Sequence, residues 1–254
     1  MWNQKRTDAD DGVTAELINI QGDNGDNIHA YFTKPNGPGP YPGIVLVHHL
    51  PGWDEFYRET ARRFSDHGYV VISPDLYERF GHGTPDDVAA KAKSEGGVSD
   101  DQVVGDCKSA MEYLKGLSYS NGKVGIIGTC SGGRHTYLVA CRTTGFDAAI
   151  DCWGGNVIMP KERLTLQQPV APIEFTENLS CPLLGLFGNE DQSPPPSEVN
   201  HQEVELKRYN KTYEFHRYDN AGHGFWYYHT HMYRQEQAME AWSKTFDFFS
   251  RYLL

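Results

Sequence analysis

Cys130 lies at the centre of the segment GTCSGG (128–133), with a glycine two positions before it and another two positions after it. This G-x-C-x-G spacing matches G-x-S-x-G, a sharp strand-to-helix turn that lifts a nucleophilic side chain out of a sheet. The flanking positions must be small because the strained backbone has close neighbours. The start of a helix also favours a thiolate and offers free N–H groups to an oxyanion. The pattern therefore predicts a cysteine nucleophile for acyl transfer.

Two other interpretations of this segment stay open. A tight strand-to-helix turn can bury a cysteine without any chemistry, and a slip of one residue would make Ser131 the nucleophile. The glycines at 128 and 132 centre the turn on Cys130 and favour it over Ser131. The other cysteines fall in apolar patterns and are expected to be inert core thiols; they are Cys107, Cys141, Cys152 and Cys181.

A cysteine at such a turn needs a histidine and an acid, in the chain order nucleophile, acid, histidine. Asp191 follows the apolar run PLLGLF (182–187), and His223 follows YEFHRY (213–218). Catalytic groups gather at the carboxyl ends of strands in open α/β sheets, so we expect these side chains to meet. His223 would take the thiol proton or pair with the thiolate, and Asp191 would fix the imidazole tautomer. Glu190 competes for the role of the acid.

An oxyanion hole needs two backbone donors. The residue after the nucleophile, Ser131, supplies one. The second should come from HHLPG (48–52), the loop after the apolar run GIVLV (43–47), where Leu50 is the candidate. Metal binding is not expected from the histidine-rich stretches, because no carboxylate or third histidine follows at a suitable spacing.

The elements that must hold these residues alternate between strand and helix over most of the chain. Short apolar runs of the kind that buried parallel strands show occur at 43–47, 69–73, 123–127, 147–153 and 182–187. Helical spacing of apolar residues occurs between them and again from about Arg234 to the end. The sequence predicts an α/β fold, a mostly parallel central sheet with helices on both faces, preceded by a hairpin over about 13–33. One domain over 1–254, with a ragged stretch at 1–12, is the simplest organisation.

Composition limits the partners. Lys plus Arg is 23 and Asp plus Glu is 34, a formal net charge of −11. Nucleic-acid and anionic-membrane surfaces need clustered Lys and Arg, so neither partner is expected. No apolar run approaches the length of a membrane helix, and no apolar segment follows the basic residues at the N-terminus. Five cysteines with no CxxC pair indicate reduced thiols, so a cytoplasmic location is expected.

The chain resembles the dienelactone hydrolase family. The residues that carry the resemblance are GTCSGG, YSNGKVG (119–125) before it, GYVVISPDLYER (68–79), RET (58–60), and the contexts of Asp191 and His223. The resemblance implies an α/β-hydrolase fold, a Cys-Asp-His triad made of Cys130, Asp191 and His223, and no metal or organic cofactor. It also implies hydrolysis of lactones or activated esters through a thioester.

The chain departs from this family at two positions. His49 occupies the place of a glutamate that helps to ionise the nucleophile, so it would either pair with a thiolate or only shape the pocket. Tyr227 occupies the place of an arginine that binds a substrate carboxylate, while Arg79 matches the family's other arginine. These departures put activity on dienelactone itself in doubt. Several aromatics near the expected site loops are candidates for an apolar pocket; they are Trp53, Trp153, Trp226 and Tyr227.

Three hypotheses follow for the function. The first is a cofactor-free hydrolase of a small lactone or carboxylic ester, acting as a monomer or small homo-oligomer. The second is a thiol acyltransferase or thioesterase on the same three residues. The third is a non-catalytic ligand-binding protein on a hydrolase scaffold, which the change at His49 leaves open.

Overall fold

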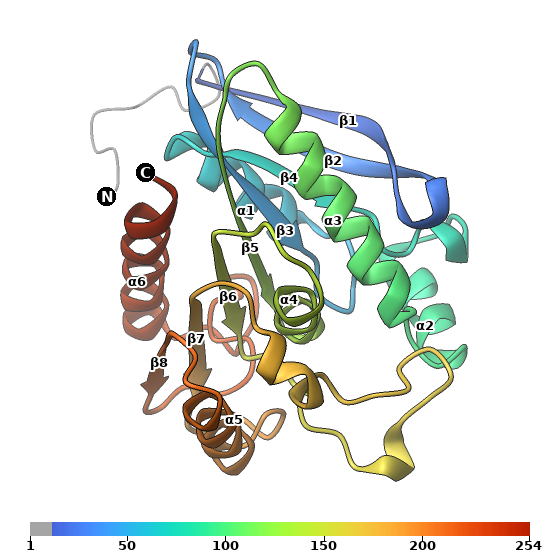
Figure 1. Cartoon of the computed structure of the whole chain (residues 1–254), viewed down its shortest axis with the longest axis vertical. Helices are drawn as coiled ribbons and strands as arrows, with labels where there is room; N and C mark the ends of the chain where they lie inside the picture. The colour runs from blue at the N-terminus through green and yellow to red at the C-terminus, as the bar shows by residue number, and fades with distance from the viewer. Residues whose placement is uncertain (1–11) are drawn as a thin grey trace.

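The computed structural model describes residues 12–254. The predicted ragged N-terminus lies outside this range except for Gly12. The described residues form one eight-stranded sheet in the order β1-β2-β4-β3-β5-β6-β7-β8 (Figure 1). Its strands are β1 (Val13–Gln21), β2 (Asn27–Pro35), β3 (Tyr41–Val47), β4 (Val70–Pro74), β5 (Ser120–Thr129), β6 (Ala148–Cys152), β7 (Leu183–Gly188) and β8 (Tyr213–Tyr218).

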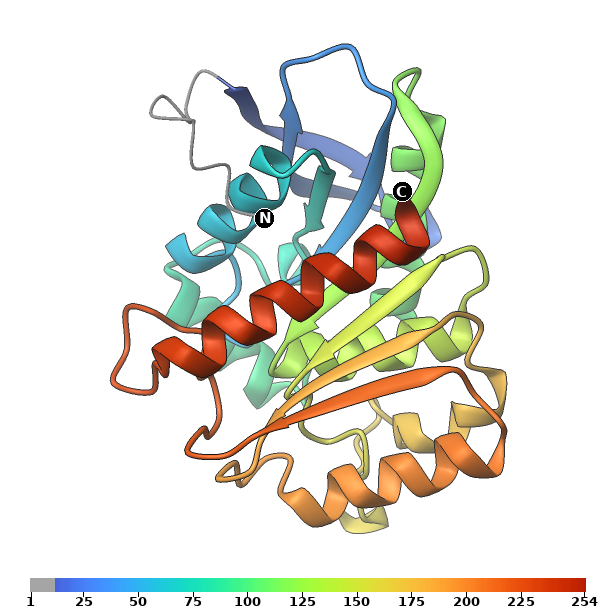
Figure 2. The ribbon, with the colours of Figure 1, turned by 90° about the vertical axis from the view of Figure 1, so that its left-hand side faces the viewer.

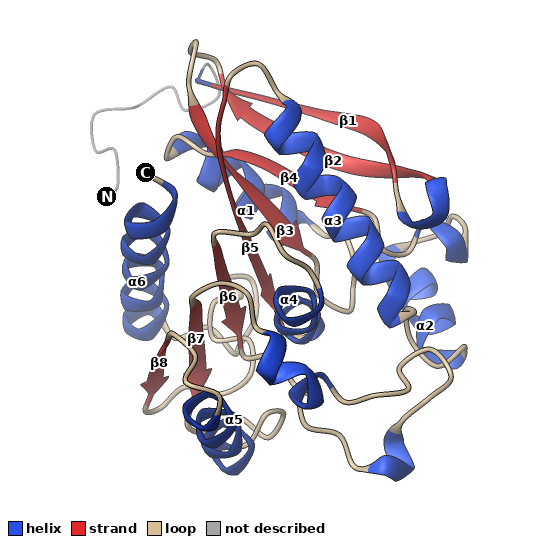
Figure 3. Ribbon diagram, in the orientation of Figure 1, coloured by secondary structure: helices blue, strands red, loops and turns tan. Residues whose placement is uncertain are grey.

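The sheet is parallel except at its N-terminal edge. β1 pairs antiparallel with β2 as the predicted hairpin, and β2 pairs antiparallel with β4. All pairings from β4 to β8 are parallel, as the matching arrow directions of β5, β6 and β7 show in Figure 3. The carboxyl ends of these strands therefore share one edge, and the loops after them meet there. The predicted mostly parallel sheet is confirmed.

Helices cover both faces of the sheet. α3 (Asp100–Gly116) and α4 (Ser131–Arg142) pack on one face, and α1 (Glu55–Asp66) and α6 (Gln235–Leu253) pack on the other. Figure 2 shows α6 crossing its face of the sheet. The remaining helices are α2 (Pro85–Ser94), α5 (Pro196–Arg208) and the short 3₁₀ helices η2 (Asp23–Gly25), η3 (Glu78–Phe80), η4 (Lys161–Arg163) and η5 (Pro172–Asn178).

The wholly apolar strands follow from this burial on both sides. Along β3, Ile44 and Leu46 join the hydrophobic cluster under α1 and α6, while Val45 and Val47 join the cluster under α3 and α4. Because side chains alternate across a strand, a strand covered on both faces needs apolar residues at every position. This is why no polar alternation marks these strands in the sequence.

Candidate functional site at the Cys130 turn

Cys130 lies between the end of β5 and the first residue of α4, with φ 55° and ψ −121°. This left-handed backbone conformation is costly for a residue with a side chain. The Cys130 N–H donates to the Cys152 carbonyl at the end of β6, 3.0 Å away, which helps to hold the turn. A Cβ at Gly128 would collide with the Gly132 carbonyl, and a Cβ at Gly132 would collide with the Val47 carbonyl. The two glycines thus make room for the turn.

His223 and Asp191 come together beside this turn. Asp191 follows β7, and its Oδ2 lies 2.9 Å from His223 Nδ1. Its other oxygen, Oδ1, accepts the Ser193 N–H at 2.8 Å, so both carboxylate oxygens have a partner. The Asp191 side chain is buried, whereas Glu190 is exposed. Asp191 is therefore the acid that contacts the histidine.

His223 also hydrogen-bonds the Cys130 side chain, which leaves this contact to Nε2 because Nδ1 faces Asp191. Burial alone would lower the pKa of His223. The hydrogen bonds to Asp191 and Cys130, together with the charges of both groups, outweigh burial and raise the pKa to about 10. His223 is therefore placed to hold or transfer a proton beside Cys130.

Cys130 opens into a cavity of about 540 Å³. Of the residues singled out in the sequence, Cys130, Ser131, Asp191, His223 and Leu50 line it. Other parts of the wall come from the start of α4, from the end of α2 and the loop after it, and from the segment after β6; among these residues are Lys93, Val98, Arg134, His135, Asn156, Met159, Arg163, Thr165 and Gln168. The cavity is large enough for a drug-sized ligand.

The loop after β3 is fixed around Leu50. The Tyr77 hydroxyl donates to the Leu50 carbonyl at 2.7 Å. His48 accepts the Leu76 N–H at Nε2, so its proton is on Nδ1, which donates to the His49 carbonyl at 2.8 Å. Burial lowers the pKa of His48, although the charge of Asp75 opposes this shift. The lowered pKa keeps the His48 ring neutral. His48 is therefore a structural support of this loop.

His49 does not face Cys130. Its Nε2 lies 2.8 Å from Asp54 Oδ2, and its Nδ1 lies 3.0 Å from the Tyr227 hydroxyl. The chain of contacts continues from Tyr227 to Thr129 Oγ1 at 2.8 Å and from Thr129 to the Tyr57 hydroxyl at 2.7 Å. Both nitrogens of His49 are thus occupied, and the network passes through Thr129, the residue before Cys130. Of the two roles expected for His49, the geometry does not provide an ion pair with the thiolate.

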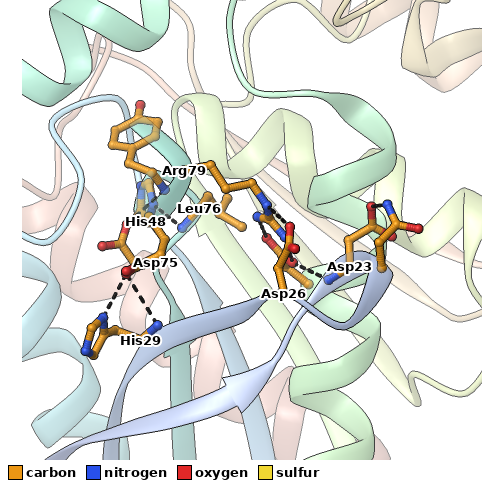
Figure 4. A network of polar contacts seen from close by, with 11 residues as sticks. Asp23, Asp26, His29, His48, Asp75, Leu76 and Arg79 are labelled. Atoms are coloured by element: carbon orange, nitrogen blue, oxygen red, sulfur yellow. Dashed lines mark hydrogen bonds and ion pairs between the residues drawn. The ribbon is translucent and has the colours of Figure 1, made fainter. Parts of the chain in front are cut away.

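Arg79 lies away from the cavity, contrary to the expectation from the sequence. Its Nη1 and Nη2 donate to the two carboxylate oxygens of Asp106 at 2.8 and 3.0 Å, and its Nε donates to Asp26 at 2.7 Å. Figure 4 shows Arg79 turned toward Asp26, with His48 and Leu76 beside it. The Asp106 side chain on α3 is fully buried and needs a cation. That demand explains why Arg79 points to α3 instead of to a substrate.

The four aromatics expected in the pocket also lie outside the cavity. Trp153 packs its ring against Phe225 at 4.8 Å between centroids, and Trp226 stacks on Trp242 of α6 at 4.3 Å. Tyr227 belongs to the His49 network, and the Trp53 indole N–H donates to Ser73 at 3.2 Å. Large rings that follow buried strands gain most from burial in the core, and this places Trp153 and Trp226 beneath the site.

Sequence reasoning missed most of the residues of the cavity wall, among them Tyr77, Arg134 and His135. Tyr77 holds the Leu50 loop, and Arg134 and His135 stand on α4 directly after the turn. Arg134 is buried and forms a bidentate ion pair with Asp100, at 2.6 and 3.1 Å. The sequence did contain a signal for Arg134 and His135, because these two adjacent polar residues interrupt the mostly apolar helical segment GGRHTYLVA (132–140). Buried polar residues in such a helix need partners and so mark a specific environment.

The class of protein follows from this fold and this turn. A mostly parallel sheet, covered on both faces, with a strained strand-to-helix turn after β5 and a histidine and acid after later strands, defines the α/β-hydrolase fold. The model of the "Dienelactone hydrolase family" matches residues 28–253, and the chain therefore belongs to this family. It is a hydrolase, and its substrates are small molecules. No helix in residues 12–254 has the length and apolar character that crossing a membrane requires.

Individual relatives agree with the family. A protein of Methylorubrum extorquens named "Putative carboxymethylenebutenolidase" is 31% identical over 251 residues, covering 97% of this chain and 84% of its own. The "Carboxymethylenebutenolidase" of Pseudomonas putida is 31% identical over 221 residues, covering 84% of this chain and 86% of its own. The crystal structure of a "Putative Dienelactone Hydrolase" from Klebsiella pneumoniae superposes with a TM-score of 0.86 at 29% identity, covering 94% of this chain and 99% of that one.

Proposed function

We propose that the protein hydrolyses a lactone or carboxylic ester through a thioester on Cys130. The observation that carries this proposal is the convergence of Cys130, His223 and Asp191 on one cavity. The Cys130 thiolate attacks the carbonyl carbon, and the new S–C bond forms as the carbonyl becomes an oxyanion. The Ser131 and Leu50 amides are the proposed oxyanion donors. Ser131 begins α4, so its N–H has no carbonyl one turn earlier in the helix.

Collapse of this intermediate breaks the C–O bond to the leaving group. The His223 imidazolium gives its proton to the leaving oxygen, which in a lactone remains attached to the acyl chain as a hydroxyl. Neutral His223 then takes a proton from water, and the hydroxide attacks the thioester. The second collapse breaks the S–C bond and releases the carboxylic acid, with Cys130 again a thiolate beside the imidazolium. Asp191 holds the His223 tautomer throughout.

The test is turnover of p-nitrophenyl acetate and a panel of lactones by wild type, Cys130→Ala and Ser131→Ala. We expect Cys130→Ala to lose activity on every substrate and Ser131→Ala to keep it, because only the Ser131 amide takes part. Full activity of Cys130→Ala would overturn the proposal. Tight ligand binding without any turnover would favour a binding protein instead. A transfer product formed with added alcohols or thiols would favour an acyltransferase.

A further inference from the structure

His135 is a buried polar side chain with one nitrogen left for a ligand. The residue is only 5% exposed, and it lines the Cys130 cavity from α4. Its Nδ1 faces Arg134 Nη1 at 3.4 Å, the one hydrogen bond of this ring among residues 12–254. Nε2 remains accessible, unlike the enclosed and unpartnered Nε of Arg134. The free nitrogen of His135 is therefore open to the cavity.

The neighbours of His135 fix which nitrogen carries the proton. A guanidinium only donates, so Nδ1 must accept and the proton sits on Nε2. Arg134 is itself held by its bidentate ion pair with buried Asp100, so this donor cannot turn away. Burial lowers the pKa of His135 well below its usual value, and the nearby charge of Arg134 lowers it further. The ring thus stays neutral and presents an N–H group.

A neutral, fixed N–H donor in a cavity selects for an acceptor. Burial removes part of the hydration of the His135 Nε2–H group. A ligand that leaves this group unpaired therefore binds more weakly, whereas a ligand oxygen atom can accept its hydrogen bond. The cavity wall also includes apolar side chains such as Val98 and Met159, which can contact a ligand but have no side-chain oxygen to accept a hydrogen bond.

We propose that His135 is a specificity residue whose Nε2–H donates a hydrogen bond to a second oxygen function of the substrate. The preferred substrates are then esters or lactones whose acyl part bears a carbonyl, hydroxyl or ether oxygen in addition to the reacting group. This inference rests on the proposed function only in placing the substrate in the Cys130 cavity.

The kinetic test compares nitrophenyl esters of 4-oxopentanoic and 5-oxohexanoic acids with esters of the parent acids that lack the oxo group. Wild type should prefer at least one oxo ester by about tenfold in kcat/KM, the value of one good neutral hydrogen bond. His135→Leu should reduce this ratio to about one by lowering kcat/KM more for the oxo esters than for the parent esters, and His135→Gln should restore part of the ratio. Exposed His201 on α5 provides the matched control, because His201→Leu should change nothing.

A binding test separates this inference from the proposed mechanism. Amides of the same acids are titrated into Cys130→Ala protein and into Cys130→Ala/His135→Leu protein, so no hydrolysis is needed. We expect tighter binding of an oxo amide than of its parent in the first protein and no difference in the second. Nitrogen NMR should show a neutral His135 ring protonated at Nε2. No oxo preference in either experiment, or the same preference after His135→Leu, would overturn the proposal, even if Cys130 proves to be the nucleophile.

Discussion

Replacing Tyr227 by phenylalanine tests whether His49 supports the Cys130 turn or ionises the thiol. The substitution removes one oxygen atom, which lies 3.0 Å from His49 Nδ1 and 2.8 Å from Thr129 Oγ1. Because the Asp54 carboxylate only accepts, it holds a His49 proton at Nε2, and Nδ1 is left to accept the Tyr227 hydroxyl. Tyr227 in turn accepts the Thr129 hydroxyl.

The magnitude follows from the groups left behind. Both partners are buried, so Tyr227→Phe leaves the His49 nitrogen without a donor and the Thr129 proton without its acceptor. An unmade hydrogen bond of a buried neutral group costs about 1–3 kcal/mol, and phenylalanine regains part by its greater hydrophobicity. We expect a net loss of about 2–3 kcal/mol, which in a chain of this size lowers Tm by roughly 4–12 °C.

The assay measures thermal unfolding by circular dichroism beside kcat/KM on p-nitrophenyl acetate. Tyr227 does not line the cavity, so activity well below the melting temperature should stay within about tenfold of wild type. The adjacent Tyr228, which is 46% exposed and makes no such hydrogen bonds with residues 12–254, gives the control Tyr228→Phe with little change in either measurement. A Tyr227→Phe protein with wild-type Tm and a hundredfold or greater loss of activity would refute the reasoning, because the network would then act on the thiolate.

Three further predictions concern charge and thiol reactivity. The pH profile of kcat/KM should fall at high pH near the raised pKa of His223, about 10, because the imidazolium loses its proton there. Asp191→Asn should move this fall to lower pH, and an unchanged profile would contradict the contact between Asp191 and His223. Arg79→Ala should lose about 3–5 kcal/mol of unfolding free energy because it strands the buried Asp106 carboxylate, yet KM for carboxylate-bearing lactones should not rise. Iodoacetamide at neutral pH should label Cys130 alone, as peptide mapping would show, since burial raises the pKa of the other four thiols.

The sequence predicted the parts of the site that local chemistry dictates. Gly128 and Gly132 are required by the turn itself, and the expected strands at 182–187 and 213–218 end a few residues before Asp191 and His223. A parallel sheet then brings these strand ends to one edge without further information. The mostly parallel sheet, the helix-covered faces and the meeting of His223 with Asp191 follow from such short-range signals, whereas the order of the strands was not predicted.

Side-chain direction depended on partners that no local pattern reveals. Arg79 turns to Asp106, 27 residues away in sequence, because a buried carboxylate demands a cation. His49 turns to Tyr227, 178 residues away, instead of toward Cys130. The sequence did not single out His135, because its proposed role depends on its hydrogen bond with Arg134 and on its place in the cavity wall. Family correspondence placed Arg79 and His49 near the site but could not orient them.

The most direct test of the account is to trap the acyl-enzyme. Protein mixed with p-nitrophenyl acetate, quenched in acid within a single turnover, is analysed by intact mass and peptide mapping. We predict a mass increase of one acetyl group, located on Cys130 and released by hydroxylamine as a thioester is. An acetyl group on Ser131, or steady turnover with no modification of Cys130 at any time, would contradict the account.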